Sequence, residues 1–222
     1  MSKPQSGRGE GAYAERTIAA YRVHAEKAIR EWGRRRQPSR FLKRFANALP
    51  RGGRVLDYGC GIGEEMAWLR GRGFRVEGVE GTLEFLLAAR RRCPGVRILH
   101  ARFERVPLPP ARYDGIWCNA ALIHVPPPEL ARQLEKLKTA LRPGGLLGLT
   151  LCWGRGKRFL RGDWIPGRYL AGYTKPEITA LLTGWEIRRL KTVTGDGRGG
   201  RWIQFLGSWD NGKHGGRDPC DG

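Results

Sequence analysis

The feature that most constrains the fold is a short apolar run that leads directly into a glycine-rich turn. Residues 54–57 have the pattern of a buried strand, and Gly59, Gly61 and Gly63 follow at every second position. Glycine lets a backbone bend sharply and approach a ligand at the start of the next helix. A strand, a glycine turn and a helix in this order predict the first unit of an α/β domain with a parallel sheet.

Alternating strand and helix patterns continue along most of the chain. Seven strands are expected, at 54–57, 74–80, 96–99, 113–119, 146–152, 186–193 and 201–209. A glycine-rich segment, 195–200, joins the last two strands and predicts an antiparallel hairpin. The expected fold is therefore α/β, with a Rossmann-like seven-stranded mixed sheet that is parallel except for a terminal antiparallel hairpin and is flanked by helices.

A chain of 222 residues is long enough for one domain of this class. We expect a disordered N-terminus at 1–11, a helical lid at 12–49, a Rossmann-like core at 50–210 and a flexible tail at 211–222, with 12–210 forming the single domain. Periodic apolar residues in the lid predict one helix over 12–36 and a second over 39–49.

Composition excludes several classes of protein. No run of about 18 apolar residues suggests a membrane span, and the N-terminus has no apolar segment of the kind that directs secretion. The five cysteines are scattered, odd in number and without a C-x-x-C pair, which argues against a disulfide framework and a zinc site. We expect a cytoplasmic protein with no membrane partner and no metal.

The formal net charge of +20 has two interpretations. Clustered basic residues neutralise phosphates, so the charge is consistent with a nucleic-acid partner. The alternative is compositional, because 32 of the 41 basic residues are arginine, as expected for a GC-rich genome.

The residues around the glycine turn indicate what kind of ligand it holds. The order Asp57-x-Gly-x-Gly-x-Gly63 differs from the G-x-G-x-x-G spacing of dinucleotide sites. Glu64 and Glu65 follow in the first turn of the next helix, where they would repel a pyrophosphate. A ligand without phosphates fits this turn better.

A second acid, Glu80, ends the second expected strand, 23 positions after Asp57. A carboxylate at this point of a Rossmann-like unit accepts hydrogen bonds from ribose hydroxyls. The alternative is an exposed strand-end acid with no ligand.

Taken together, these motifs resemble the class I S-adenosylmethionine-dependent methyltransferases of the small single-domain kind. The resemblance rests on four segments in order and spacing, 55–63, 78–80, 113–117 and 141–145. It extends from about residue 21 to residue 209. It implies S-adenosylmethionine as the cofactor, a ligand with a net positive charge, and transfer of its methyl group by direct displacement.

The resemblance also implies a set of cofactor-binding residues: Tyr21, Asp57, Gly59, Gly61, Gly63, Glu80, Arg102, Phe103 and Asn119. The glycines would line the methionine and ribose portion, and Asp57 would hold the turn and the ligand's amino group. Glu80 would bind the ribose, Asn119 would offer its backbone carbonyl, and Tyr21 would close over the cofactor.

One position departs from the family pattern. Relatives usually carry an Asp after the third strand, whose carboxylate accepts from the adenine amino group, but this chain has Arg102 there. Arginine has no acceptor and cannot make that bond. Three alternatives follow: Arg102 stacks on the purine, Glu104 supplies the carboxylate, or Arg102 points into solvent.

His124, just beyond the fourth strand, is the candidate catalytic residue, as a general base. The alternative is a packing or cofactor-shaping role, because transfer to a good nucleophile needs mainly in-line positioning. The basic and aromatic segment 153–168 and the N-terminal helices would build the acceptor site, with Arg168 and Tyr169 as candidate substrate contacts. Segment 153–168 suggests an anionic or aromatic acceptor, and the alternative is a solvated loop.

The expected acceptor is a small molecule, because the chain has no separate RNA-binding module. The first alternative is RNA, particularly tRNA, since residues 1–54 carry 14 Lys and Arg against 4 Glu. A third is a protein that binds S-adenosylmethionine without catalysis.

Overall fold

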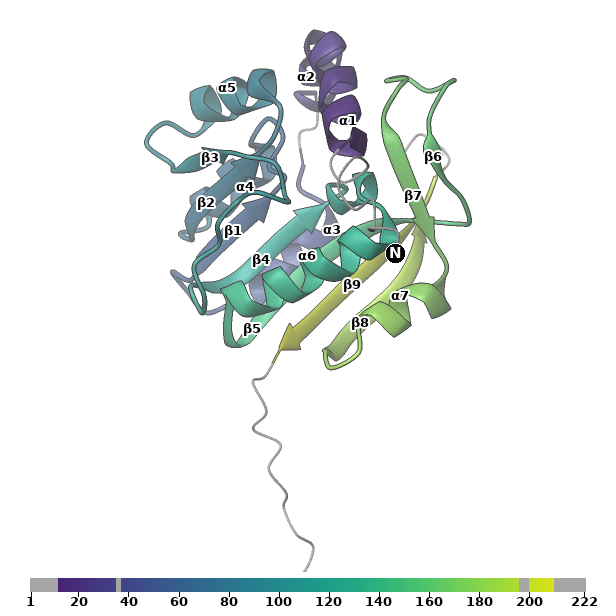
Figure 1. Cartoon of the computed structure of the whole chain (residues 1–222). Coiled ribbons are helices and arrows are strands. Elements are labelled where there is room, and N and C mark those ends of the chain that lie inside the picture. Colours follow the sequence, from purple (N-terminus) through teal and green to yellow (C-terminus); the bar gives the residue numbers. More distant parts are fainter. Residues whose placement is uncertain (1–11, 35–36, 196–199, 210–222) are drawn as a thin grey trace, which may run out of the picture.

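The computed structural model describes residues 12–34, 37–195 and 200–209; the expected disordered N-terminus (1–11) and flexible tail (211–222) lie outside the described residues. Seven α-helices, one 3-10 helix and nine strands follow one another in these residues (Figure 1). In chain order they are α1 (Ala12–Val23), α2 (Ala25–Trp32), α3 (Arg40–Asn47), β1 (Arg54–Tyr58), α4 (Glu64–Gly71), β2 (Arg75–Glu80), α5 (Leu83–Arg92), β3 (Ile98–His100), β4 (Tyr113–Asn119), η1 (Leu122–His124), α6 (Pro127–Ala140), β5 (Leu141–Trp153), β6 (Lys157–Phe159), β7 (Tyr169–Tyr173), α7 (Lys175–Leu181), β8 (Glu186–Thr194) and β9 (Arg201–Trp209).

Seven of the strands form the sheet that the sequence predicts. They lie in the order β3-β2-β1-β4-β5-β9-β8, with β3 to β5 mutually parallel. β9 runs antiparallel to both β5 and β8, so the chain ends in the expected antiparallel pair. The Rossmann-like mixed sheet is confirmed, while residues 196–199 of the hairpin connection lie outside the described residues.

Two further strands, β6 and β7, were not predicted. β7 pairs in parallel with the very end of β5, where Cys152 lies opposite Gly172, and β6 pairs antiparallel with β7. Phe159 and Tyr169 face each other across this pair with their ring centroids 5.5 Å apart. The segment 157–159 has no alternation of apolar and polar residues that would predict a strand. It is held as a strand by its pairing with β7 and by the contact between Phe159 and Tyr169. The expected seven-stranded sheet is therefore extended to nine strands.

The expected helix over 12–36 is wrong in one respect, because the chain breaks it into α1 and α2 at His24. The backbone of His24 has φ −111° and ψ 19°, outside the helical range, and its side chain makes no capping bond. The break turns α2 so that Trp32 reaches the rings of Tyr21 and Phe85, at centroid distances of 6.0 and 4.9 Å.

The second helix that was expected in the lid is α3 of the structure, and it packs in the core beneath the sheet. Phe41 and Phe45 on α3 each lie 5.1 Å, ring centroid to ring centroid, from Trp117 at the centre of β4. All three side chains are buried. The segment expected as lid, 12–49, therefore divides into two helices over the site and one helix under the sheet.

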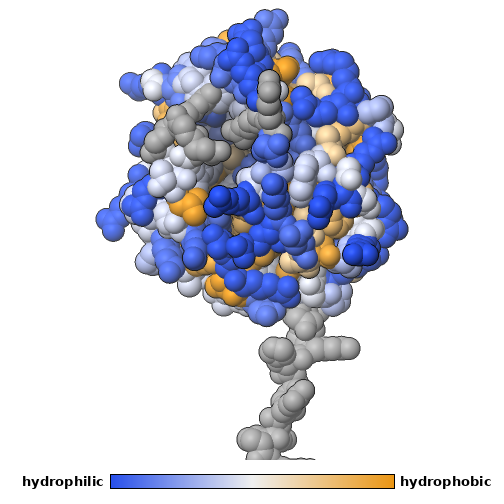
Figure 2. Space-filling model, turned by 180° about the vertical axis from the view of Figure 1, so that it is seen from behind, coloured by the Kyte–Doolittle hydropathy of each residue, from blue (hydrophilic) through white to orange (hydrophobic). Residues whose placement is uncertain are grey.

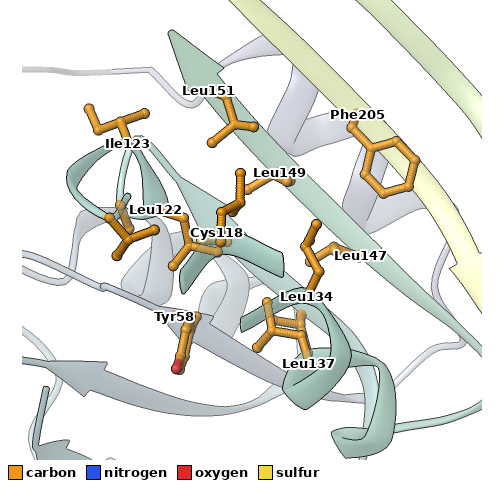
Figure 3. Packing of buried hydrophobic residues seen from close by; sticks show 14 of the residues in the cluster. Tyr58, Cys118, Leu122, Ile123, Leu134, Leu137, Leu147, Leu149, Leu151 and Phe205 are labelled. Atoms are coloured by element: carbon orange, nitrogen blue, oxygen red, sulfur yellow. The ribbon is translucent and has the colours of Figure 1, made fainter. Parts of the chain in front are cut away.

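The strand pleat divides the buried side chains between two faces of the sheet. On β1, Val55 faces the cluster built by α3, α4 and α5, whereas Leu56 faces the cluster built by α6 and α7. Neighbouring residues on β4, Ile116 and Trp117, separate in the same way. Figure 1 shows α6 and α7 covering one face, and Figure 3 shows the leucines of α6 packed against β4 and β5. Both faces of the sheet are thus covered, as a parallel sheet requires.

The centre of the sheet contains a position where only glycine fits. Gly148 on β5 lies directly opposite Trp117 on β4. A Cβ added to Gly148 would lie 2.6 Å from the indole of Trp117 and 2.9 Å from the ring of Phe45. The missing side chain makes the room that the tryptophan occupies.

We expect Gly148→Ala to lower the free energy of unfolding by about 1–3 kcal/mol, the usual cost of forcing extra volume into a packed core. Gly71→Ala is the matched control, since Gly71 ends α4 and a Cβ there would meet nothing within 4 Å. Urea unfolding of the two variants measures the difference. Equal stability of Gly148→Ala and the wild type would contradict this packing arrangement.

Candidate active site

The site lies where the carboxyl ends of β1, β2 and β4 meet. β1 pairs with β2 on one side and with β4 on the other, so the strand order reverses beside it. Open α/β sheets bind ligands in the crevice that such a reversal leaves. The glycine turn after β1, Glu80 at the end of β2 and Asn119 at the end of β4 all reach this place.

The glycine turn adopts the backbone conformation for which glycine is needed. Gly59, Gly61 and Gly63 have φ values of 87°, 53° and 79°. A Cβ on Gly59 would lie 2.4 Å from the side chain of Ala121, so no other residue fits there. The amides of Gly59 and Cys60 both donate to the carbonyl of Val79, at 2.9 and 3.0 Å, and tie the turn to β2.

Glu80, at the end of β2, is buried beside the turn. The alternative of an exposed acid at the end of the strand is therefore wrong. Its side chain accepts hydrogen bonds from the amide of Gly61 at 2.9 Å and from the amide of Thr82 at 2.7 Å. A carboxylate has about four acceptor sites, so these two bonds leave capacity for hydroxyl groups of a ligand.

Three carboxylates converge beneath the turn: Asp57, Glu65 and Glu80. Asp57 is 1% exposed, and its Oδ2 has no hydrogen-bond partner in the described part of the chain. Burial, and then the charges of Glu65 and Glu80, raise the pKa of Asp57 well above its ordinary value. Buried negative charge of this kind is stabilised by a cation placed beside it.

Glu65 also organises the end of β4. Its carboxylate accepts from the indole of Trp117 at 2.7 Å and from the side-chain amide of Asn119 at 2.9 Å. The hydroxyl of Thr150 donates to the Asn119 side-chain oxygen at 2.6 Å and accepts from the amide of Ala120 at 2.8 Å. Ala120 has a φ of 52°, a conformation that a non-glycine residue rarely adopts. The network therefore holds a strained turn directly after Asn119.

The structure shows where Arg102, Phe103 and Glu104 lie after β3, and it bears on the alternatives given for Arg102. Arg102 donates to Glu15 on α1 at 2.9 Å and is 20% exposed, so it does not point freely into solvent. Phe103 stacks on Tyr58 at 4.6 Å and also lies beside Gly59. Glu104 accepts from the hydroxyl of Tyr13 at 2.6 Å, while its Oε2 is buried with no hydrogen-bond partner in the described residues.

Tyr21 on α1 lies over the site and joins the lid to the sheet. Its hydroxyl oxygen lies 2.8 Å from Nε2 of His124 and accepts a hydrogen bond from Arg168 at 2.9 Å. Its ring lies 5.4 Å from that of Phe85. On the adjoining helix, Trp32 comes within 3.7 Å of where a Cβ on Gly61 would be, so the lid covers the glycine turn.

His124 is partly buried and is held in a neutral form. Its Nδ1 lies 2.7 Å from the carbonyl of Tyr169, so Nδ1 carries the proton and Nε2 accepts from Tyr21. Burial lowers the pKa of His124 to about 4, against the opposing effect of the bond to Tyr169. The ring therefore carries no charge at neutral pH.

The predicted substrate residues Arg168 and Tyr169 join this group. Arg168 is 7% exposed, forms an ion pair with Asp163 and donates to the carbonyl of Ile165 at 3.0 Å. The amide of Tyr169 donates to the hydroxyl of Thr17 on α1 at 3.0 Å. Tyr21, His124, Arg168 and Tyr169 thus meet at one place although they are far apart in the sequence.

Four residues of the site were not singled out from the sequence: Trp32, Glu65, Phe85 and Asp163. Asp163 does lie in segment 153–168, and Trp32 lies in the N-terminal helices, both of which were expected to build the acceptor site. Glu65 was noted only as an acid that repels phosphate, and Trp32 only as part of a helical stripe. Their contacts depend on how the lid lies on the sheet, which no local pattern encodes.

The described residues contain neither a metal-binding cluster nor a membrane-spanning helix. No three His, Cys, Asp or Glu side chains gather there in an arrangement that could hold a metal ion. Within the same residues, every helix is too short or too polar to cross a membrane.

The chain matches a family described as a methyltransferase domain over residues 55–145. It is 32% identical over 111 residues to the malonyl-[acyl-carrier protein] O-methyltransferase of Enterobacter lignolyticus, covering 50% of this chain and 43% of that protein. It is 34% identical over 100 residues to the trans-aconitate 2-methyltransferase of Rhodopseudomonas palustris, a match that covers 44% of this chain and 38% of that protein. The chain thus spans about two fifths of the length of the curated relatives it matches.

Solved structures extend the likeness to the whole fold. The 1,6-didemethyltoxoflavin-N1-methyltransferase of Burkholderia thailandensis, with bound 1,6-didemethyltoxoflavin and S-adenosylhomocysteine, superposes with a TM-score of 0.72 at 21% identity. The match covers 95% of this chain and 94% of that one. Residues 55–145 thus match a methyltransferase domain, and the chain as a whole shares the fold of a solved methyltransferase.

Proposed function

We propose that the protein binds S-adenosylmethionine at the glycine turn and transfers its methyl group to a small-molecule acceptor. The observation that carries this proposal is the acid cluster of buried Asp57 and Glu80 with partly buried Glu65, in which Oδ2 of Asp57 has no hydrogen-bond partner in the described residues. A cationic ligand would relieve the charge of this cluster and give Oδ2 a donor. A pyrophosphate would add negative charge to it.

The residues present fit the cofactor that the family uses. Asp57 would hold its amino group and Glu80 its ribose hydroxyls, while the positive-φ glycines let the backbone approach it. The Asn119 carbonyl lies at the end of β4, where the Glu65 network fixes it. Bound S-adenosylmethionine supplies an electrophilic methyl group on a positively charged sulfur.

The chain's own residues orient the acceptor and can take up its proton. Tyr21, Trp32 and Phe85 form an aromatic cover that keeps water from the site. Neutral His124 can accept a proton at Nε2 from the Tyr21 hydroxyl, which takes the acceptor's proton in turn. Arg168 donates to the same hydroxyl and holds it in place.

The relatives support a small acceptor, since those named above act on malonyl-[acyl-carrier protein], trans-aconitate and 1,6-didemethyltoxoflavin. The cysteines of the described residues (Cys60, Cys93, Cys118 and Cys152) are free. Free thiols support the proposal that the protein works in the reducing cytoplasm.

RNA is the second candidate acceptor, and a basic surface favours it. A hollow of about 480 Å³ beside α3 is lined by Arg40, Lys43 and Arg44 together with Asn47 and Ala48. Figure 2 shows that the face of the molecule seen from behind is mostly hydrophilic. Such a surface attracts polyanions whether or not they are substrates, so binding alone does not distinguish the two candidates.

Turnover distinguishes them. We expect tritiated S-adenosylmethionine to label a product in a low-molecular-weight extract of the source organism and to leave total RNA at the level of a heat-denatured control. Saturable labelling of one RNA species would replace the small-molecule proposal with the RNA alternative. Tight cofactor binding with no labelled product in either sample would favour the non-catalytic alternative.

Asp57→Asn should affect stability and binding in opposite directions. Removing a buried charge with an unpartnered oxygen should stabilise the ligand-free protein at neutral pH by about 1–2 kcal/mol. Affinity for S-adenosylmethionine should fall about tenfold to a hundredfold, the effect of losing a charge-assisted hydrogen bond worth roughly 1.5–3 kcal/mol. Urea unfolding and calorimetric titration measure the two effects.

The gain in the free energy of unfolding from Asp57→Asn should increase as the pH rises above about 4. Because the folded-state pKa of Asp57 is raised, the wild type loses stability as the pH rises from about 4, where an unfolded Asp ionises, through the folded-state pKa. The gain should therefore shrink as the pH falls toward about 4. Glu135→Gln, which alters an acid that is 68% exposed on α6, is the matched control. A destabilised Asp57→Asn with unchanged cofactor affinity would refute the assigned role.

The ring of His124 should remain neutral above about pH 5, because its pKa is lowered to about 4. Nitrogen-15 NMR should show the proton on Nδ1 and no protonation of Nε2 from about pH 8 down to about pH 5. The His124→Gln variant identifies the signal by its loss. A midpoint near the ordinary histidine value of 6.5 would show that the ring is not buried as described.

A further inference from the structure

A second hollow, of about 540 Å³, lies where α1 meets the β6–β7 extension. Its lining residues are Arg16, Arg158, Phe159, Leu160, Arg161 and Gly162. Three of the six are arginines and none is acidic. The hollow lies outside the cofactor site, since none of its lining residues belongs to the glycine turn or the acid cluster.

The three guanidinium groups are available to a ligand. In the described part of the chain, no carboxylate lies within ion-pair distance of Arg16, Arg158 or Arg161. Arg16 lies over the ring of Phe159 with its Cζ 4.0 Å from the ring centroid, which fixes one cation against an apolar wall. Guanidinium groups in such a hollow match the planar, bidentate geometry of carboxylate and phosphate.

Direct contacts connect the hollow to the catalytic residues. The ring of Phe159 lies 5.5 Å from that of Tyr169, and the carbonyl of Tyr169 accepts the Nδ1 proton of His124. Arg16 and Tyr21 are on the same helix, five positions apart, which corresponds to about 7.5 Å of helical rise. The hollow therefore lies about one and a half helical turns from Tyr21, the residue proposed to take the acceptor's proton.

We propose that this hollow binds an anionic group of the methyl acceptor, a carboxylate or a phosphate, at a distance from the atom that is methylated. The proposal rests on the proposed function and names its substrate class. Arg158 and Arg161 bind the anion, and Arg16 positions the Phe159 wall. The β6–β7 extension thus gives the site its specificity for a charged acceptor.

The test uses two charge-matched double variants of the full chain. Arg158→Gln with Arg161→Gln removes two exposed charges at the hollow, whereas Lys43→Gln with Arg44→Gln removes two on α3. Calorimetric titration at low ionic strength with citrate and with pyrophosphate measures anion binding and separates a carboxylate site from a phosphate site. We expect the wild type to bind one of the two, the first variant to bind it at least tenfold more weakly, and the second to match the wild type.

A second arm follows the acceptor itself. A metabolite extract is separated by anion exchange, and each fraction is incubated with tritiated S-adenosylmethionine. The proposal predicts labelled product in a retained, anionic fraction, with a raised KM in the Arg158 and Arg161 variant and unchanged cofactor affinity.

Three results would overturn the anion site: no binding of either probe, equal weakening in both double variants, or labelled product only in the neutral fraction. Absence of labelled product in every fraction would count against the proposed methyl transfer, and the probe titrations would still decide the anion site.

Discussion

The mutual repulsion of three carboxylates beneath the glycine turn, two of them buried, is the main electrostatic constraint on the site. Asp57, Glu65 and Glu80 are held together by the fold, and each is anchored differently. Glu80 accepts hydrogen bonds from the amides of Gly61 and Thr82, and Glu65 accepts hydrogen bonds from the side chains of Trp117 and Asn119. Asp57 keeps one oxygen without a partner. The unpartnered, buried charge of Asp57 lowers the stability of the ligand-free chain, and a bound cation would compensate it.

The lid is bound to the sheet by polar contacts that converge on one hydroxyl group. Tyr21 connects α1 to His124 after β4 and to Arg168 before β7. Thr17, one turn earlier on α1, accepts from the amide of Tyr169. The start of β7 and the residue before it therefore hold the lid on the sheet.

The sequence predicted the parts of this structure that local patterns encode. The seven main strands, the glycine turn and Glu80 follow from apolar runs and turn residues, which fix backbone conformation within a few positions. The break at His24 was missed, because apolar spacing continues across it and an unstrained turn leaves no signature. The strands β6 and β7 were missed because long-range pairing defines them: β7 pairs with β5, and β6 pairs with β7.

Side-chain partners were the least predictable part of the site. Arg102 was expected at the adenine or in solvent, yet it donates to Glu15, a helix residue 87 positions away. The relation of Arg168 to Tyr21 spans 147 positions. Such pairs depend on how the lid packs on the sheet, and this packing cannot be predicted from local patterns in one sequence.

The charge of the site offers the most direct test of the account. A cation that binds beside Asp57 favours the ionised carboxylate, so binding should expel any proton held there. Calorimetric titration with S-adenosylmethionine should show affinity rising with pH until the raised pKa of Asp57 is passed, with proton release revealed by buffers of different ionisation enthalpy. A parallel titration with NAD should give no binding. Tight binding of NAD, or binding of S-adenosylmethionine that neither releases protons nor depends on pH, would contradict the central claim.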